Sequence, residues 1–195
     1  MSVVVEKSEK VWTEAELSAL PNDDYLHEVV GGELVMSPKN NLQHERICQR
    51  LNFALEVFNR AHRLGAVFGS SLGFWMGNRN CRAPDVAFVA KARLIKLGYK
   101  PDTKSFFTGA PDLAVEVLSP SNTRLEMDER LTDFFTNGAQ IAWIVHPDEQ
   151  FVEVCHSRTD RRLVGPSGFL EGEQLLPGFR LPVIDLFGNW DWEQP

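Results

Sequence analysis

Two apolar segments that flank an amphipathic stretch place the strongest constraint on the fold of this chain. Residues 112–118 are nearly continuous in Leu, Ala and Val, which predicts a strand buried on both faces. Residues 125–136 carry apolar side chains at helical spacing and precede an Asn-Gly pair, which predicts a helix and its end. Residues 141–145 predict a second strand. This order forms a βαβ unit, so we expect the two strands to be parallel.

Shorter elements are predicted around this unit. A capping box that begins at Thr13 predicts a short helix, and residues 25–36, with a Gly-Gly pair at their centre, predict a β-hairpin. Apolar residues at helical spacing predict a long helix from residue 44 to about residue 64, ended by Gly65. Further strands are predicted at residues 67–74, 85–89 and 151–156, whereas residues 157–177 show no interpretable pattern.

Together these elements predict an α/β fold with a mixed central sheet and flanking helices. No internal repeat, low-complexity segment or linker divides the sequence, and its length suits one domain. We therefore expect residues 1–195 to form a single domain.

The charge balance bears on how the chain could meet nucleic acid. Acidic residues outnumber basic ones, 27 to 20, which gives a net charge of −7. Proteins that bind DNA by neutralising phosphates usually carry a basic surface. The balance therefore argues against tight, sequence-independent DNA binding, but it is compatible with an enzyme whose acids surround a metal ion.

Two further features bear on location and on metal chemistry. Residues 1–7 lack the basic start and long apolar stretch of a signal peptide, and no apolar run approaches the ~20 residues that cross a bilayer, so we expect a cytoplasmic protein. The three cysteines, Cys48, Cys81 and Cys155, are odd in number and widely spaced. They suggest neither a disulfide framework nor a thiolate zinc site.

Two acidic residues lie in or directly beside predicted apolar strands. Glu116 lies inside the apolar segment, and burying its charge is costly unless something compensates it. Asp85 opens another predicted strand, directly after Pro84. If the two strands are neighbours, both carboxylates can bind one hard divalent cation, which could activate a water molecule against a phosphodiester. Asp112 shares the face of Glu116 and either joins this site or caps the start of the strand.

Arg130 is a candidate for the cation that such chemistry needs. It lies at the edge of the apolar stripe of the predicted helix, so its guanidinium group can reach back toward the sheet. Because arginine stays protonated, it can stabilise negative charge but cannot act as a general base. A plain salt bridge to an acid on the helix face is an equally good interpretation. His44, at the start of the long helix, could contact a metal or phosphate, but an ordinary helix-end role is favoured.

Several segments resemble one protein family, the putative restriction endonucleases of the Uma2 type, within the PD-(D/E)XK nuclease superfamily. The resemblance extends from about residue 14 to residue 187. The segments that carry it are residues 27–38, 82–87, 111–121 and 138–145, together with His44.

The resemblance implies a restriction-endonuclease-like core and hydrolysis of nucleic acid, DNA in the first place, with Mg²⁺, or Mn²⁺ in its place. By position, Asp85 matches the first aspartate of the family motif and Glu116 its second acid. The usual lysine position, two residues beyond that acid, holds Leu118, and the family's alternative lysine position in the following helix holds Arg130.

Three functions are therefore compared. The first is a Mg²⁺-dependent DNA endonuclease, expected to be a homodimer because cutting both strands needs two sites. The second is a lapsed nuclease that binds nucleic acid or a protein partner without cleavage, which Arg130 and the acidic net charge favour. The third, ranked lowest, is another metal hydrolase that uses the same acids.

Overall fold

The computed structural model describes residues 3–4, 11–21, 23 and 25–190. Its centre is the predicted βαβ unit: β9 (Leu113–Val117), α4 (Arg124–Thr136) and β10 (Ile141–His146). Strands β9 and β10 are parallel, with Glu116 paired to Ile144, which confirms the prediction from the two apolar segments. A capping box between Thr123 and Glu126 fixes the start of α4.

The sheet around this unit is mixed. Its strand order is β12-β11-β10-β9-β7-β4, and every pair except β9 with β10 is antiparallel. Strand β7 lies directly beside β9, with Val86 paired to Val115, so the strand that Asp85 precedes is the neighbour of the strand that holds Glu116. The remaining strands are β4 (Gly65–Gly69), β7 (Val86–Ala90), β11 (Phe151–Cys155) and β12 (Arg161–Val164).

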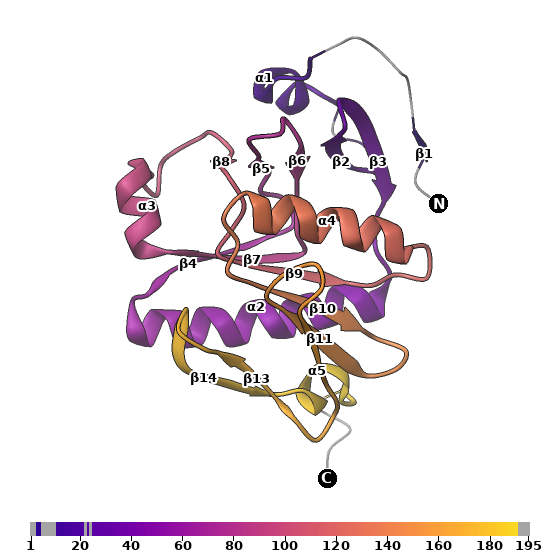
Figure 1. Ribbon diagram of the computed structural model, residues 1–195, viewed down its shortest axis with the longest axis vertical. Coiled ribbons are helices and arrows are strands. Elements are labelled where there is room, and N and C mark those ends of the chain that lie inside the picture. The colour runs from indigo at the N-terminus through magenta and orange to yellow at the C-terminus, as the bar shows by residue number, and fades with distance from the viewer. Residues whose placement is uncertain (1–2, 5–10, 22, 24, 191–195) are drawn as a thin grey trace.

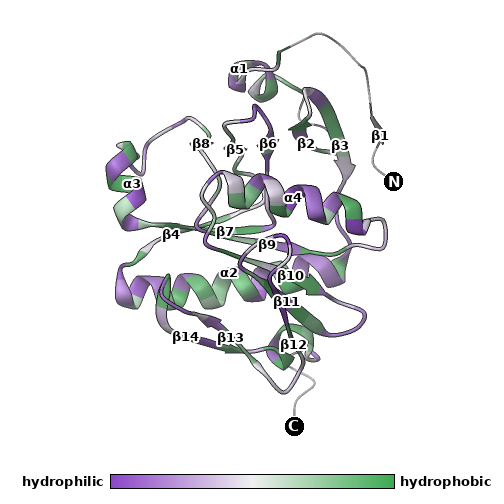
Figure 2. Cartoon of the chain, in the orientation of Figure 1, coloured by the Kyte–Doolittle hydropathy of each residue, from purple (hydrophilic) through white to green (hydrophobic). Residues whose placement is uncertain are grey.

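Helices cover both faces of this sheet (Figure 1). On one face, α2 (Leu42–His62) packs Leu51 and Leu55 into a core with Val115 and Trp143. On the other face, apolar side chains of α4 join a second core, with residues that include Met127, Leu131, Phe134, Ala114 and Ile144. Strand β7, between the helices, is coloured as hydrophobic in Figure 2, as burial on both faces requires. The predicted α/β class with flanking helices is confirmed.

A second sheet stands at one end of the first. Its strand order is β1-β3-β2-β6-β5-β8, and its best-formed part is the predicted hairpin of β2 (Tyr25–Val30) and β3 (Glu33–Pro38). The predicted capping box at Thr13 is also present, at the start of α1 (Glu14–Ser18). The other strands are β1 (Val3–Val4), β5 (Phe74–Trp75), β6 (Cys81–Arg82) and β8 (Phe107–Thr108).

Some expectations need correction. Helix α2 ends at His62 and is capped by Arg63, which adopts the left-handed conformation, so Gly65 does not end it. Gly65 instead opens β4, where an added Cβ would lie 2.1 Å from the carbonyl oxygen of Val89, so close strand approach explains this glycine. The predicted strand at residues 67–74 is divided, because β4 and β5 belong to different sheets.

The stretch without an interpretable pattern, residues 157–177, contains β12, β13 (Phe169–Gly172) and the start of β14 (Leu176–Pro182). The remaining helices are α3 (Lys91–Leu97) and α5 (Ile184–Phe187). Among the described residues, no helix combines the length and hydrophobicity that crossing a membrane requires. The expectation that the chain has no signal peptide rests on residues 1–7, and most of these lie outside the described residues.

Candidate active site

A polar pocket of about 240 Å³ opens where the two sheets meet α2 and α4. Its lining includes Glu28, His44, Asp85, Glu116 and Arg130. Three of the four residues predicted from the sequence, Asp85, Glu116 and Arg130, are thus brought to one place by three different elements. The rest of the wall is mostly polar, with Lys39, Asn41, Ser119, Ser121 and Asn122 among its residues.

Strand pairing sets the two carboxylates side by side. Because β7 is antiparallel to β9, the residue that precedes β7 lies at the end of β9 where Glu116 and Val117 stand. Asp85 Oδ2 accepts a hydrogen bond from the backbone N–H of Val117 at 2.8 Å. Glu116, in the same strand, is only 6 % exposed, and its side chain faces α4. The pairing therefore fixes Asp85 against the strand that carries Glu116.

Arg130 reaches from α4 to the sheet. Its Nη1 donates to Glu116 Oε1 at 2.9 Å and to Glu28 Oε1 at 3.0 Å, and its Nη2 donates to Glu28 Oε2 at 2.6 Å. Its salt bridges are thus to acids of two strands and not to a neighbour on the helix face. This arrangement places a permanent positive charge directly beside Glu116.

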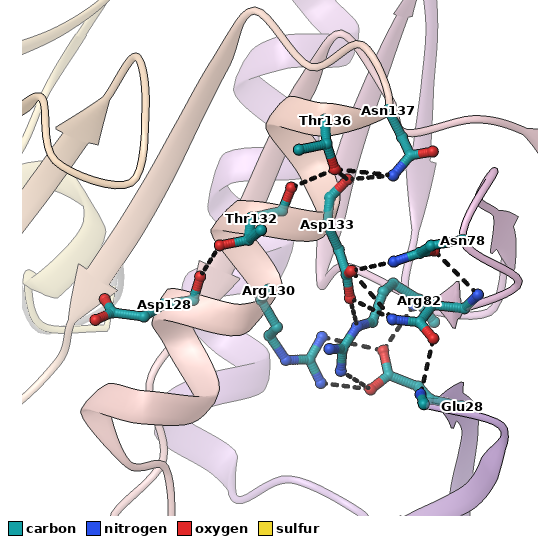
Figure 3. Close-up of polar contacts among 12 residues, drawn as sticks. Glu28, Asn78, Arg82, Asp128, Arg130, Thr132, Asp133, Thr136 and Asn137 are labelled. Atoms are coloured by element: carbon teal, nitrogen blue, oxygen red, sulfur yellow. Dashed lines mark hydrogen bonds and ion pairs between the residues drawn. The ribbon is translucent and has the colours of Figure 1, made fainter.

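Glu28 is the site residue that sequence reasoning missed. Figure 3 shows its carboxylate between the guanidinium groups of Arg130 and Arg82. It also accepts the backbone N–H of Ala83 at 2.8 Å. Arg82 in turn donates to Asp133 at 2.7 Å. The side chains of Glu28, Arg82 and Asp133 are all buried. A charged residue inside the apolar half of the hairpin is the signal that could have revealed Glu28, as it revealed Glu116.

This cluster is short of positive charge. Three acids, Glu28, Glu116 and Asp133, contact the two guanidinium groups of Arg82 and Arg130. A fourth acid, Asp85, contacts neither group but lies near enough to affect the pKa of Glu116. Burial raises the pKa of Glu116 from 4.5 to about 8; Arg130 opposes this rise, and Asp85 and Glu28 add to it. Burial lowers the pKa of Arg130, but Glu116 and Glu28 outweigh that effect and hold it above its usual value. A bound divalent cation would supply the missing charge.

The raised pKa of Glu116 predicts a pH dependence of stability in protein freed of metal by EDTA. Between pH 4.5 and about 8 the folded protein keeps a proton on Glu116 that the unfolded chain releases. Stability from this group is therefore complete below pH 4.5 and is lost as pH rises toward 8. Relative to Glu116→Gln, the free energy of unfolding of the wild type should fall across this window by an amount on the order of a few kcal/mol.

Urea unfolding followed by circular dichroism over a pH series measures this difference. Glu116→Gln is the matched reference, because glutamine has the shape of the protonated acid and does not titrate. Parallel stability profiles for the two proteins across the window would contradict the assigned burial effect.

The donor atoms fit a hard cation. Asp85 Oδ2 is engaged by Val117 and by His44 Nε2, and Glu116 Oε1 by Arg130. Among the described residues no hydrogen bond reaches the other oxygen of either carboxylate, and neither oxygen is sealed from the pocket. Each acid thus keeps one oxygen for a ligand, which is the donor type that Mg²⁺ and Mn²⁺ prefer.

Asp112 is not brought to this pair. Its Oδ2 accepts from the backbone N–H of Ala90 at 2.9 Å, its Oδ1 accepts from Gln140 at 2.9 Å, and Arg93 lies 3.7 Å away. It does not line the pocket. Four residues along a strand span about 13 Å, so a face shared with Glu116 does not mean proximity. We therefore leave Asp112 out of the proposed metal site.

His44 lies beside one of the pocket acids, closer than its place at the start of the long helix suggested. It is buried, its Nε2 is 3.2 Å from Asp85 Oδ2, and its Nδ1 is 3.4 Å from Cys48 Sγ. Burial raises the pKa of the Cys48 thiol above its usual value, and the carboxylate of Asp85 adds to the effect. The imidazole thus joins the pocket acid to a buried thiol on α2.

Comparison with known proteins identifies the family and the fold. A family model described as Uma2, putative restriction endonuclease, matches residues 14–184, which is most of the chain. The crystal structure of a putative nuclease belonging to DUF820 from Anabaena variabilis ATCC 29413 is similar, with a TM-score of 0.77 and 21% identity. The match covers 90% of this chain and 97% of that one. None of the curated proteins compared with the chain matches it. At this level of identity, the structural likeness establishes a shared fold.

Proposed function

The chain belongs to the Uma2 family of putative restriction endonucleases, and from that premise we propose that it is a divalent-metal-dependent nuclease that hydrolyses phosphodiester bonds of DNA. One observation carries the proposal. Asp85 and Glu116, from adjoining strands, meet in a pocket with Arg130, and each acid keeps an oxygen free for a cation. Metal-assisted phosphodiester hydrolysis uses both parts of this pocket, acids that hold the ion and a cation that stabilises developing negative charge.

Each side chain has a role set by its contacts. Asp85 and Glu116 would hold Mg²⁺ or Mn²⁺. When bound, such an ion polarises the phosphodiester and lowers the pKa of a coordinated water molecule. Arg130 stabilises the negative charge that develops on the phosphate oxygens, and it takes no proton because its pKa is held high. Glu28 orients Arg130 through two hydrogen bonds and is a positioning residue.

A second function has a specific observation in its favour. The family's lysine position holds Arg130, whose guanidinium group is shared between Glu28 and Glu116 and cannot exchange a proton. If the reaction needs an amine at that position, the chain binds nucleic acid or a protein partner without cutting. The two functions differ in what an Arg130→Lys variant does.

The test compares wild type with Arg130→Lys on supercoiled plasmid, single-stranded DNA and RNA, with Mg²⁺, Mn²⁺ or EDTA. We expect the wild type to cut DNA with either metal and not with EDTA. Cleavage by Arg130→Lys alone would identify a lapsed nuclease. Failure of both proteins to cut, and to bind a divalent ion by calorimetry, would reject the proposed site.

The plasmid also tests the assembly. One site cuts one strand, so a monomer produces nicked circles, whereas linear product from a single encounter requires two sites. We propose that the active form is a homodimer, with linear product and a dimer mass in light scattering as the expected results. Nicked circles alone, from a protein of monomer mass, would exclude the dimer.

A further inference from the structure

Helix α2 carries two side chains of metal-ligating type one turn apart, and the first of them, His44, lines the pocket. His44 and Cys48 are separated by four residues, so both point the same way, toward the start of β7. They are 3 % and 7 % exposed, and Asp85 completes the group from the β7 side. Among the described residues, this is the one group of three such side chains close enough together to share an ion.

The distances suit a small tetrahedral ion. One ligand atom from each side chain can be chosen so that all three lie within 4.8 Å of one another. His44 Nε2 lies 3.2 Å from Asp85 Oδ2, and His44 Nδ1 lies 3.4 Å from Cys48 Sγ. Ligands at about 2.0–2.3 Å from a tetrahedral ion stand about 3.3–3.6 Å apart. The ion takes only one ring nitrogen, so binding requires the imidazole to turn until that nitrogen faces both Asp85 and Cys48.

We propose that His44, Cys48 and Asp85 form a binding site for a zinc-class transition-metal ion, separate in chemistry from the Mg²⁺ site. A thiolate, an imidazole and a carboxylate are ligands that Zn²⁺ accepts, whereas Mg²⁺ prefers oxygen alone. Three protein ligands leave a fourth position, which a water molecule from the pocket can fill. Zn²⁺ displaces the Cys48 proton to solvent as the metal–sulfur bond forms, with no change of oxidation state.

Asp85 belongs to both sites, and this has a regulatory consequence. An ion held by His44, Cys48 and one Asp85 oxygen withdraws negative charge from the other Asp85 oxygen, which is the one proposed to bind Mg²⁺. Zn²⁺ should therefore inhibit cleavage in competition with Mg²⁺. This consequence rests on the proposed nuclease function, whereas the zinc site itself does not.

Co²⁺ added to the metal-free full-length chain tests the site without any activity measurement. We expect a near-ultraviolet absorption band from a thiolate–cobalt bond, together with visible bands typical of tetrahedral cobalt, and both should vanish when Zn²⁺ is added. Cys48→Ser should lose the thiolate band. Cys81→Ser and Cys155→Ser should keep it, because these cysteines are equally buried but belong to no such group.

The contribution of Cys48 to the site is measured as a change in zinc affinity. Competition with a chromophoric chelator should show Zn²⁺ binding weakened at least about tenfold in Cys48→Ser, since even partners in the second shell contribute about 10- to 100-fold. Zinc X-ray absorption on the wild type does not depend on any variant folding, and it should show one sulfur neighbour. Absence of that sulfur, absence of the cobalt thiolate band, or its persistence in Cys48→Ser overturns the site.

The inhibition is measured as the ratio of cleavage with and without Zn²⁺ at fixed Mg²⁺. Cys48→Ser should require at least about tenfold more Zn²⁺ for the same ratio. Bound zinc that leaves the ratio unchanged overturns the shared role of Asp85. If no variant cuts DNA, the proposed function fails, but the spectra still decide the zinc site.

Discussion

Asp85→Asn is expected to lower the rate of Mg²⁺-dependent DNA cleavage by about 100-fold or more. Asparagine has the shape of aspartate, and its carbonyl oxygen can still accept the Val117 N–H that holds the side chain against β9. The substitution removes the negative charge with which the carboxylate would bind the cation, and Glu116 then faces the ion alone. We therefore expect loss of metal affinity and of rate with little loss of folding.

Asp112→Asn is the matched control. Asp112 is buried, as Glu116 is, and directly precedes β9, but its carboxylate contacts Ala90, Gln140 and Arg93. Steady-state cleavage and Mg²⁺ calorimetry on both variants, with melting curves as a check of folding, make the comparison. Wild-type cleavage by Asp85→Asn, or an equal loss in a folded Asp112→Asn, would contradict the proposed site.

Arg82→Met should destabilise the protein by about 3–5 kcal/mol. Arg82 donates to Asp133 and lies 3.6 Å from Glu28, and all three are buried. Methionine can fill much of the space of the arginine stem, but it leaves Asp133 with only the amides of Asn78 and Asn80 to offset its charge. An uncompensated buried charge is the main cause of the expected loss.

The free energy of unfolding in urea, followed by circular dichroism, measures this effect. Arg162→Met, at an exposed position of β12, should change stability by no more than about 0.5 kcal/mol. Adding Asp133→Asn to Arg82→Met should restore part of the loss, because the second substitution removes the unpaired charge. Strictly additive losses in the double variant would show that the ion pair is not the source of the effect.

Much of the fold was predictable because its strongest signals are local. The composition and periodicity of residues 112–145 predict a strand, a helix and a second strand. The parallel pairing of β9 and β10 then follows from the helix that connects them. The division of residues 67–74 between two sheets was not predictable, because it depends on which neighbours β4 and β5 find in space. The left-handed end of α2 at Arg63, two residues before Gly65, is equally a matter of tertiary context.

The candidate site was likewise predictable only where its signals are local in the sequence. Asp85 and Glu116 could be selected because each places a charge in or beside an apolar strand. Glu28 could be suspected on the same ground, but its partners, Arg82 and Arg130, are far away in the sequence. Cys48 gave no signal, since zinc sites are recognised in sequences by paired cysteines or histidines, whereas its partner Asp85 comes from another element.

The pocket draws Glu28 from β2, Asp85 from the start of β7, Glu116 from β9 and Arg130 from α4. Strand β10, the parallel neighbour of β9, ends at His146. During synthesis, a growing polypeptide must therefore leave the ribosome as far as this histidine before its acids can assemble. Chains that end before Arg130 lack at least one of these four side chains, and chains that end before Ile141 lack the strand that pairs with β9 in parallel.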